Sequence, residues 1–512
     1  QGDTIPFLAR YRKDVTGGLD ETQLEAIEER RQYFLNLAQR QIYVLETIAR
    51  QGKLDEALRQ SIESCFDRTA LEDLYVPFKK RRRTKATAAR EHGLTPLAEY
   101  IWKQKDGGKS LEELAAAHVM PDSEVTTPAL ALEGAQHILA EDLSLNVESR
   151  TAVRNCMLTD GCITTVPTKK TEGQKTKYEA YYSFSEPVKS IPSHRFLAVQ
   201  RGVSEGYLRL ELAFDDEKLI EELVGHCLTA PGTPFEPLIR ATVIDAYNRL
   251  LRPSIETEVI RMLHDRAEAE AIHVFRANAE SLLLAPPAGS IPVIGMDPGL
   301  RTGCKLAVVD GTGAFVESGV IFPNPPQNDI DGAKEVLKSL IQRHKVRALA
   351  IGNGTGSRET SSFVRQALKE LEHDAPLCVL VNESGASIYS ASKVAREEFP
   401  ELDVTIRGAI SIARRLQDPL AELVKIEPRH VGVGQYQHDV NQRSLREGLH
   451  KTVVSCVNQV GVELNTASIA LLRYISGLNA NTAKSIVERR AKHGVYKDRQ
   501  ELLEVEGVGP KT

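Results

Sequence analysis

An aspartate at the end of an apolar run is the residue of this sequence best placed to do chemistry. Asp297 follows the largely apolar run 292–296, precedes a Pro-Gly turn, and is followed by a second apolar run over 306–309. The pattern predicts a strand hairpin with the Asp297 carboxylate at the rim of a sheet, where solvent and a divalent cation can reach it. The alternative is that Asp297 only caps the turn before Pro298.

The elements expected after this hairpin place Asp297 in an α/β domain. They are a third strand over 314–322, a helix over 330–343, a strand over 346–352, a helix over 359–371, a strand over 377–381, and two further helices. Three antiparallel strands followed by alternating helices and strands is the ribonuclease-H-like order, a mixed sheet covered on both faces. Asp297 would then lie centrally in the sheet.

A glycine-rich loop, GNGTGSRET at 352–360, joins a strand to a helix in this domain. It lacks the Gly-Lys-Ser/Thr ending of a nucleotide-triphosphatase loop and the third glycine of the dinucleotide fingerprint. Two interpretations stay open: a plain tight turn, or a loop whose backbone N–H groups and helix N-terminus meet a backbone phosphate.

Two glycine turns near the end of the sequence are candidates for nucleic-acid contact. GLNANTA at 477–483 and GVGPKT at 507–512 each follow an apolar helix end and precede another helix, and they resemble tandem helix-hairpin-helix motifs. Such turns expose backbone N–H groups to a phosphate without reading bases, whereas the alternative is a purely structural helical bundle. The candidate residues are Gly477, Asn479, Asn481, Lys484, Gly507, Gly509 and Lys511.

Two basic segments lie in the otherwise helical first half. The run 79–90 carries seven basic residues and no acid, which fits either a solvated face or a phosphate-contacting arm built from Lys79, Lys80, Arg81, Arg82 and Arg83. The segment 169–182 interleaves lysines with tyrosines, which either stack bases or are half-buried strand residues. Alternation in LAVQRG (197–202) and YLRLEL (207–212) predicts strands nearby.

The motifs DPGLRTGCKLAVVD, AIGNGTGSRET, VNESGASIYSAS and RRLQDPLAELVKIEP resemble the YqgF domain of the Tex family of bacterial transcription accessory proteins, and the resemblance covers nearly the whole chain. It implies RNA or DNA binding in support of transcription. It also implies a carboxylate set of Asp297, Glu383 and Asp418, catalytic or vestigial. No cofactor is required, and Mg²⁺ or Mn²⁺ would serve these carboxylates only if the site cleaves phosphodiesters.

The resemblance has a departure and an ambiguity. In RuvC-type enzymes the fourth strand ends in an acidic residue, but here it runs into Gly352 and Asn353, so the glutamate comes from after the next strand. Asp418 precedes Pro419, which suits a first-turn position, so Asp418 is equally well explained as a helix N-cap.

The chain is expected to be multidomain and mainly α, with a central α/β domain. We place a helical N-terminal region at 1–162, a small β-containing insert at 163–235, long helices and a linker at 236–289, the ribonuclease-H-like domain at 290–428, and the hairpin region at 429–512. The length of 512 residues fits several domains, and the net charge is -5. The seven scattered cysteines argue against a disulfide framework and a zinc ribbon and fit the cytoplasm. No membrane span is expected.

Both ends of the sequence look clipped, and the terminal OB-fold RNA-binding domain of the resembled family is missing. The function expected is sequence-independent nucleic-acid binding by a transcription accessory factor, with the transcription machinery as a further partner. The alternatives are a metal-dependent RuvC/YqgF-type nuclease and a protein-interaction scaffold.

Overall fold

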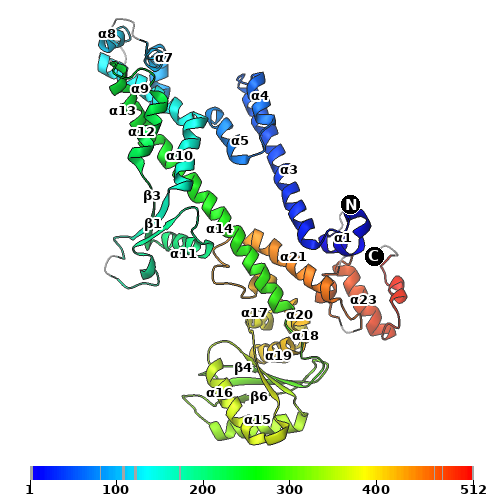
Figure 1. Ribbon diagram of the computed structural model, residues 1–512. Helices are drawn as coiled ribbons and strands as arrows, with labels where there is room; N and C mark the ends of the chain where they lie inside the picture. Colours follow the sequence, from blue (N-terminus) through cyan, green and yellow to red (C-terminus); the bar gives the residue numbers. More distant parts are fainter. Residues whose placement is uncertain are drawn as a thin grey trace. The chain divides into compact units, whose positions relative to one another are not determined.

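The computed structural model describes residues 4–80, 82–105, 110–119, 124–171, 174–465, 467–475 and 477–509, with the side chains of 372–374 excepted. Arg81 and Lys511, two of the predicted contact residues, lie outside these ranges. The chain is mainly helical and divides into two compact units, residues 22–268 and residues 1–21 with 269–512 (Figure 1). None of the helices in the described ranges is both long and apolar enough to cross a membrane.

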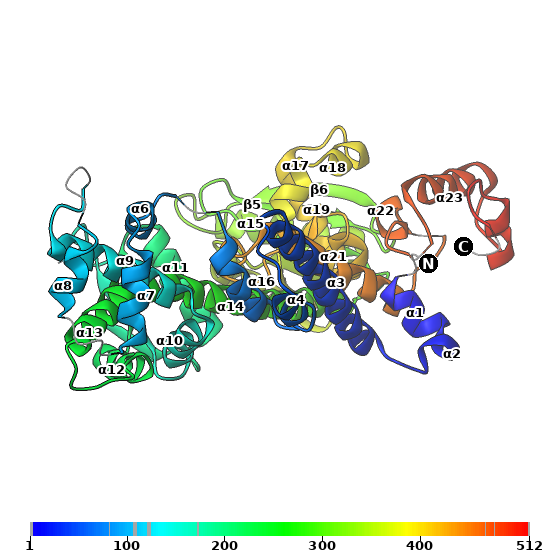
Figure 2. The same cartoon turned by 90° about the horizontal axis from the view of Figure 1, so that it is seen from above.

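Helices make up most of the 22–268 unit. They are α3 (Glu21–Arg50), α4 (Glu56–Glu63), α5 (Arg68–Tyr75), α6 (Lys85–Glu91), α7 (Thr95–Lys103), α8 (Leu111–Ala116), α9 (Pro128–Leu145) and α10 (Val147–Thr159). Helix α9 packs against α6, α7 and α13 (Phe235–Ala246), as Figures 1 and 2 show. Its alanines Ala131 and Ala135 are fully buried, which lets these neighbours approach closely.

A three-stranded antiparallel sheet follows, in the order β2 (Phe184–Pro187), β1 (Cys162–Pro167), β3 (Leu208–Ala213). The strand predicted in YLRLEL is confirmed as β3, but the one predicted in LAVQRG is wrong, because 197–202 lies in helix α11 (Ser193–Ser204). Phe196, Val199 and Gly202 are all buried at a spacing of three, so the apolar residues follow the helical period, not alternation.

Helix α14 (Arg252–Leu283) has 32 residues and is the longest helix in the described ranges. After α12 (Asp216–Cys227) and α13, a π-helical turn at Tyr247–Leu251 leads directly into it. Pro253 follows this π-helical turn closely, and the helical path continues through the proline.

The second unit contains a five-stranded mixed sheet in the order β6-β5-β4-β7-β8. Its strands are β4 (Val293–Asp297), β5 (Cys304–Val309), β6 (Phe315–Ile321), β7 (Ala348–Gly352) and β8 (Leu377–Val381). Strand β4 pairs antiparallel with β5 and parallel with β7, so it is the middle strand. The expected ribonuclease-H-like order is confirmed, and Asp297 is the last residue of the central strand.

Helices cover both faces of this sheet, each over its own apolar core. Helices α15 (Ile330–His344) and α16 (Ser357–Leu368) pack on one face, and α19 (Val404–Gln417) packs on the other. A Cβ on Gly295 in β4 would lie 1.9 Å from the carbonyl oxygen of Ala409, so only glycine lets α19 lie this close to the central strand. The remaining elements are a 3₁₀ turn at Lys369–Asp374, α17 (Ala386–Ala391), α18 (Lys393–Glu398) and α20 (Pro419–Leu423).

The C-terminal part of this unit is helical. It comprises α21 (Gln442–Val460), α22 (Ile469–Leu472), α23 (Ala480–His493) and a 3₁₀ helix at Arg499–Glu504, together with short N-terminal helices α1 (Ile5–Tyr11) and α2 (Lys13–Thr16). Leu472, Ala483 and Ile486 are buried in a core shared with Val457 of α21. This core holds the two glycine turns in place.

Candidate acidic edge and nucleic-acid interface

Asp297 and Glu383 come together at one edge of the sheet. Asp297 ends β4, and Glu383 follows β8, which is separated from β4 by β7 alone. Burial, and next the charge of Glu383, raise the pKa of Asp297 to about 6, although Lys305 on the neighbouring strand acts in the opposite direction. The negative charge of Glu383 therefore acts on Asp297 across β7.

The glycines of the loop 352–360 provide room for the Glu383 side chain. A Cβ on Gly352 would lie 2.1 Å from Oε2 of Glu383, and one on Gly354 would lie 1.6 Å from Oε1. The side-chain oxygen of Asn353 accepts a hydrogen bond from the Glu383 N–H at 3.1 Å. Of the two interpretations left open for this loop, the structure favours the tight turn over the phosphate-contacting loop. The turn also leaves space for the Glu383 carboxylate.

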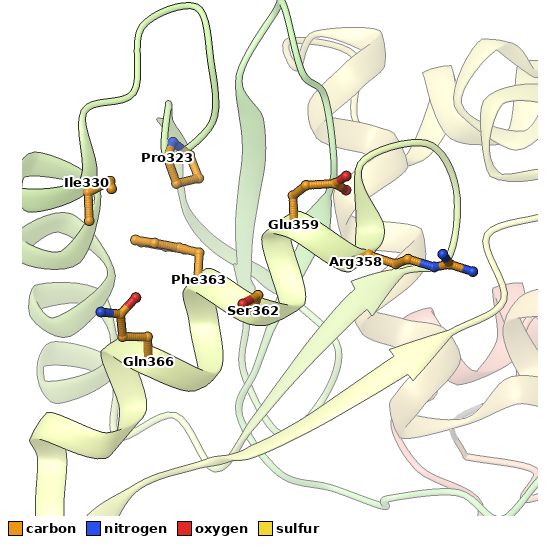
Figure 3. A pocket seen from close by; sticks show the side chains of 7 residues that line it. All are labelled: Pro323, Ile330, Arg358, Glu359, Ser362, Phe363 and Gln366. Carbon is orange, nitrogen blue, oxygen red and sulfur yellow. The ribbon is translucent and has the colours of Figure 1, made fainter.

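A hollow of about 420 Å³ lies on the flank of α16, beside this loop (Figure 3). It is lined by Pro323, Ile330, Arg358, Glu359, Ser362, Phe363 and Gln366. In Figure 3 the Arg358 side chain points away from Phe363, on the opposite side of the helix. Arg358, the one cation among the described residues of the lining, therefore does not face the apolar part of the hollow, and no anion is assigned to it.

Arg415 of α19 lies behind Glu383 and was not predicted as part of the site. Its Nη1 donates to the carbonyl oxygens of Asn382 (2.6 Å) and Ser384 (2.8 Å), the two neighbours of Glu383. Burial lowers the pKa of Arg415 to about 10, although Glu422 and Glu383 act in the opposite direction. Arg415 stays charged at neutral pH and supplies a fixed cation beside Glu383.

Asp418 caps a helix and does not complete a carboxylate triad. It is exposed, and its Oδ1 accepts the Ala421 N–H at 2.9 Å as the N-cap of α20. In the described part of the chain, the one group of three candidate metal ligands within 4.8 Å of one another is His264, Asp265 and Glu268 on α14. Asp297, Glu383 and Asp418 therefore do not converge.

The two carboxylates at the sheet edge, Asp297 and Glu383, suit one metal ion better than two. Asp297 and Glu383 could share one Mg²⁺ with water and phosphate oxygens as the other ligands. Cleavage with two ions needs more carboxylates than this pair, and a fixed guanidinium beside Glu383 competes with a cation there. The pair alone therefore lacks the carboxylates for two-ion cleavage.

The C-terminal turns both contain a glycine in the left-handed conformation. Gly477 precedes α23 with φ +92°, and Gly507 follows the 3₁₀ helix 499–504 with φ +86°. A Cβ on Gly507 would lie 2.8 Å from Cγ2 of Thr482, in the first turn of α23. The second glycine turn thus packs against the helix that follows the first, which makes the two hairpins one structural element.

The backbone N–H groups at the start of α23 are partly used by the chain itself. The Asn479 side chain accepts from the N–H groups of Asn481 (2.9 Å) and Thr482 (3.0 Å), and the Thr482 hydroxyl accepts from the Asn479 N–H (2.8 Å). This capping box differs from the bare amides that we expected. Asn479 and Asn481 are therefore placed at the turn, but as capping groups.

Exposed cations border the first turn. The predicted Lys484 is 66% exposed and pairs with Glu488 at 3.5 Å. Arg473, which lies four residues before Gly477, is exposed, and its side chain has no ion-pair or hydrogen-bond partner among the described residues. Its position one helical turn before a glycine turn is the signal by which the sequence could have identified it. Gly509 lies in the second turn, with open space where a Cβ would be.

Three of the six described basic residues in the run 79–90 are paired with acidic partners in the fold. Lys79 pairs with Glu72 at 2.7 Å, Arg83 pairs with Glu91 at 2.7 Å, and Arg90 pairs with Glu141 and with Asp142. Lys80, Arg82 and Lys85 are exposed, and their side chains have no ion-pair or hydrogen-bond partner within the described ranges. The run therefore offers a phosphate less free charge than its composition indicates.

The tyrosines of the segment 169–182 are structural. Tyr178 is buried, the Tyr182 hydroxyl donates to the carbonyl oxygen of Gln174 at 3.0 Å, and Lys177 pairs with Glu205 at 2.9 Å. These rings are not free to stack bases, so the alternative that they are half-buried fits better. They do not belong to strands, however, because they lie between β1 and β2.

Family profiles match four parts of the chain. They are a Tex-like protein N-terminal domain at 1–49, a Tex central region-like segment at 106–275, a Tex protein YqgF-like domain at 291–417 and a helix-hairpin-helix motif at 457–512.

Among the relatives that match over the whole chain are three from different organisms. The protein YdcI of Bacillus subtilis is 44% identical, and the match covers 71% of its length. The transcriptional accessory protein Tex of Neisseria gonorrhoeae is 44% identical with 67% of its length covered. The human S1 RNA-binding domain-containing protein 1 is 35% identical with 52% of its length covered.

Proposed function

The chain belongs to the Tex family, and from this premise we propose that it binds RNA or DNA without regard to base sequence, as a transcription accessory factor. The name of the Neisseria relative supports the role in transcription, and the name of the human relative supports RNA as a ligand. The contact proposed is with the phosphate backbone, because backbone contacts position a protein on nucleic acid without reading its base sequence.

The single observation that carries this proposal is the packed pair of glycine turns. Gly477 and Gly507 both hold the left-handed conformation, and the contact between Gly507 and Thr482 makes the hairpins one element. Because the capping box occupies two amides of α23, we assign the main electrostatic contribution to Arg473 and Lys484. Their charge is gathered locally, which reconciles polyanion binding with a net charge of -5.

A salt titration of nucleic-acid binding tests the proposal. Filter binding of a single-stranded RNA and a duplex DNA is measured as a function of NaCl, and log K should fall linearly with log salt. The double variant Arg473→Gln/Lys484→Gln should weaken binding about tenfold and reduce the slope by about 1–2 on duplex DNA. Lys393→Gln, at an 84% exposed lysine of α18, is the matched control. A flat salt response of the unmodified protein would refute the proposed function.

A second candidate, a metal-dependent nuclease, is favoured only by the proximity of Asp297 and Glu383. Incubation with structured RNA and branched DNA in Mg²⁺ or Mn²⁺, beside an Asp297→Asn control, separates it from binding alone. Cleavage that the control abolishes would establish the nuclease. A protein-interaction scaffold, the third candidate, requires that neither polymer is retained.

A further inference from the structure

An exposed imidazole ring lies against a half-buried tyrosine ring beside the first hairpin turn. The ring centroids of His450 and Tyr474 are 5.5 Å apart, and the two planes are inclined at 44°. His450 belongs to α21, whereas Tyr474 follows α22 and lies three residues before Gly477. The imidazole thus rests on the tyrosine ring and keeps much of its own surface open to solvent.

The fold holds both rings in place. Tyr474 packs against the hairpin core, and its carbonyl oxygen accepts a hydrogen bond from Nδ2 of Asn458 at 3.0 Å. Burial raises the pKa of Tyr474, although the neighbouring Arg473 acts in the opposite direction. His450 directly follows Leu449, which is fully buried. A pair anchored in this way needs little further ordering when a flat ligand stacks on it.

The charges around the two rings are predominantly positive. Arg473 and Lys451, the sequence neighbours of the rings, are exposed, and neither side chain has an ion-pair or hydrogen-bond partner among the described residues. The acids near the rings are already paired, Glu427 with Arg446 at 3.1 Å and Glu447 with Arg443 at 3.0 Å. Two cations without acidic partners therefore flank an exposed aromatic ring, which suits a polyanion that carries flat rings of its own.

We propose that an unpaired base of RNA or DNA stacks on His450, while Arg473 and Lys451 contact the phosphates next to that base. This subsite rests on the nucleic-acid binding proposed above and deepens it, because it adds a base contact to the phosphate contacts of the hairpins. Every base has a π face, so stacking is compatible with binding that ignores base sequence. A base paired within a duplex is already stacked on its neighbours, so the subsite takes a strand with unpaired bases.

Two strands of equal charge test the base contact. Fluorescence anisotropy measures binding of the full chain to a labelled DNA strand of about ten nucleotides and to an abasic strand of the same length, which keeps every phosphate but carries no bases. We expect the strand with bases to bind about five- to tenfold more tightly. Equal affinity for the two strands would overturn the stacking subsite and leave phosphate binding intact. Retention of neither strand would refute the proposed function and the subsite together.

Two variants at position 450 assign the preference to the ring. His450→Ala should weaken binding of the strand with bases about fivefold and leave binding of the abasic strand unchanged. His450→Phe keeps an aromatic ring and should retain the preference. His194→Ala, at an exposed histidine of α11 in the 22–268 unit, is the matched control and should bind both strands normally. Circular dichroism verifies that each variant is folded.

The two variants also state what would contradict stacking. An equal loss on both strands in His450→Ala would show that the imidazole contacts phosphate and not a base. A loss in His450→Phe as large as in His450→Ala would show that the aromatic ring is not what the strand requires. Either result would overturn the proposal.

Discussion

The carboxylate of Glu383 lies where a side chain on Gly354 would begin: a Cβ on Gly354 would be 1.6 Å from Oε1 of Glu383. The glycine loop 352–360 and the segment after β8, which are separated in the sequence by helix α16 and strand β8, therefore constrain each other. The glycine loop determines where the carboxylate lies, and the carboxylate in turn requires glycine in the loop.

The first prediction concerns this contact. Gly354→Ala should reduce the free energy of unfolding by about 1–3 kcal/mol, because the methyl group forces Glu383 from its place. Thermal and denaturant unfolding measure the loss. In a Glu383→Ala background the same substitution should cost much less, since the clashing atoms are gone. An equal loss in both backgrounds would show that Glu383 is not the cause.

The second prediction concerns the pH dependence of stability. The pKa of Asp297 is about 6 in the folded chain against 3.8 as the ordinary value, so the folded state holds its proton more tightly. The resulting stability is fully present below about pH 4 and is lost as pH rises through about 6. Asp297→Asn should therefore raise the free energy of unfolding at pH 7.5 by about 1–2 kcal/mol, allowing for partial solvent screening.

The measurement is an unfolding series between pH 4 and pH 8 on both proteins. The variant should lack the fall in stability between pH 4 and pH 6 that the unmodified chain shows. Curves that stay parallel across this range would mean that Asp297 titrates normally.

Local patterns were sufficient to predict the central sheet. Apolar runs bounded by Gly, Pro and charged residues gave β8 at 377–381 and placed Asp297 at the end of β4, as observed. They failed at 197–202, where a short apolar stretch satisfies both alternation and the helical period, and burial of Phe196 and Val199 decides for the helix.

Contacts between distant segments could not be predicted from the sequence. The run 79–90 looked like free positive charge because its partners, Glu72 and Glu141, lie outside it. Arg415 lies more than 30 residues from Glu383, and only the packing of α19 brings its guanidinium behind that carboxylate. The sequence identified Asp418 as a candidate for either of two roles, and the fold alone shows it capping α20.

The third prediction concerns a buried ring of charges in the 22–268 unit. Asp73 accepts from Arg150 and from Arg154, both at 2.7 Å, and Glu258 of α14 accepts from the same two arginines. Asp73→Asn leaves two buried guanidiniums with one carboxylate, which should cost about 3–5 kcal/mol. Trp102 fluorescence reports unfolding of this unit.

Glu46→Ala is the control for this loss, because Glu46 pairs with Arg50 on the surface of α3 and should cost less than about 0.5 kcal/mol. The Asp73→Asn loss should persist at about 1 M NaCl, since buried charges are poorly screened. A loss that disappears in high salt would contradict a buried ring.

The fourth prediction tests whether the two hairpins act as one element. Gly507→Ala places a methyl group 2.8 Å from Cγ2 of Thr482 and puts alanine at φ +86°, so it should separate the second turn from α23. Thr482→Ser removes Cγ2 but keeps the hydroxyl of the capping box. If docking of the turns is what presents Arg473 and Lys484 to phosphates, Gly507→Ala should weaken RNA retention several-fold and Thr482→Ser should partly restore it. Gly494→Ala, also at positive φ but in open space, controls for backbone strain alone. Equal losses from Gly494→Ala and Gly507→Ala, with no rescue by Thr482→Ser, would assign the effect to strain and leave the hairpins as independent contacts.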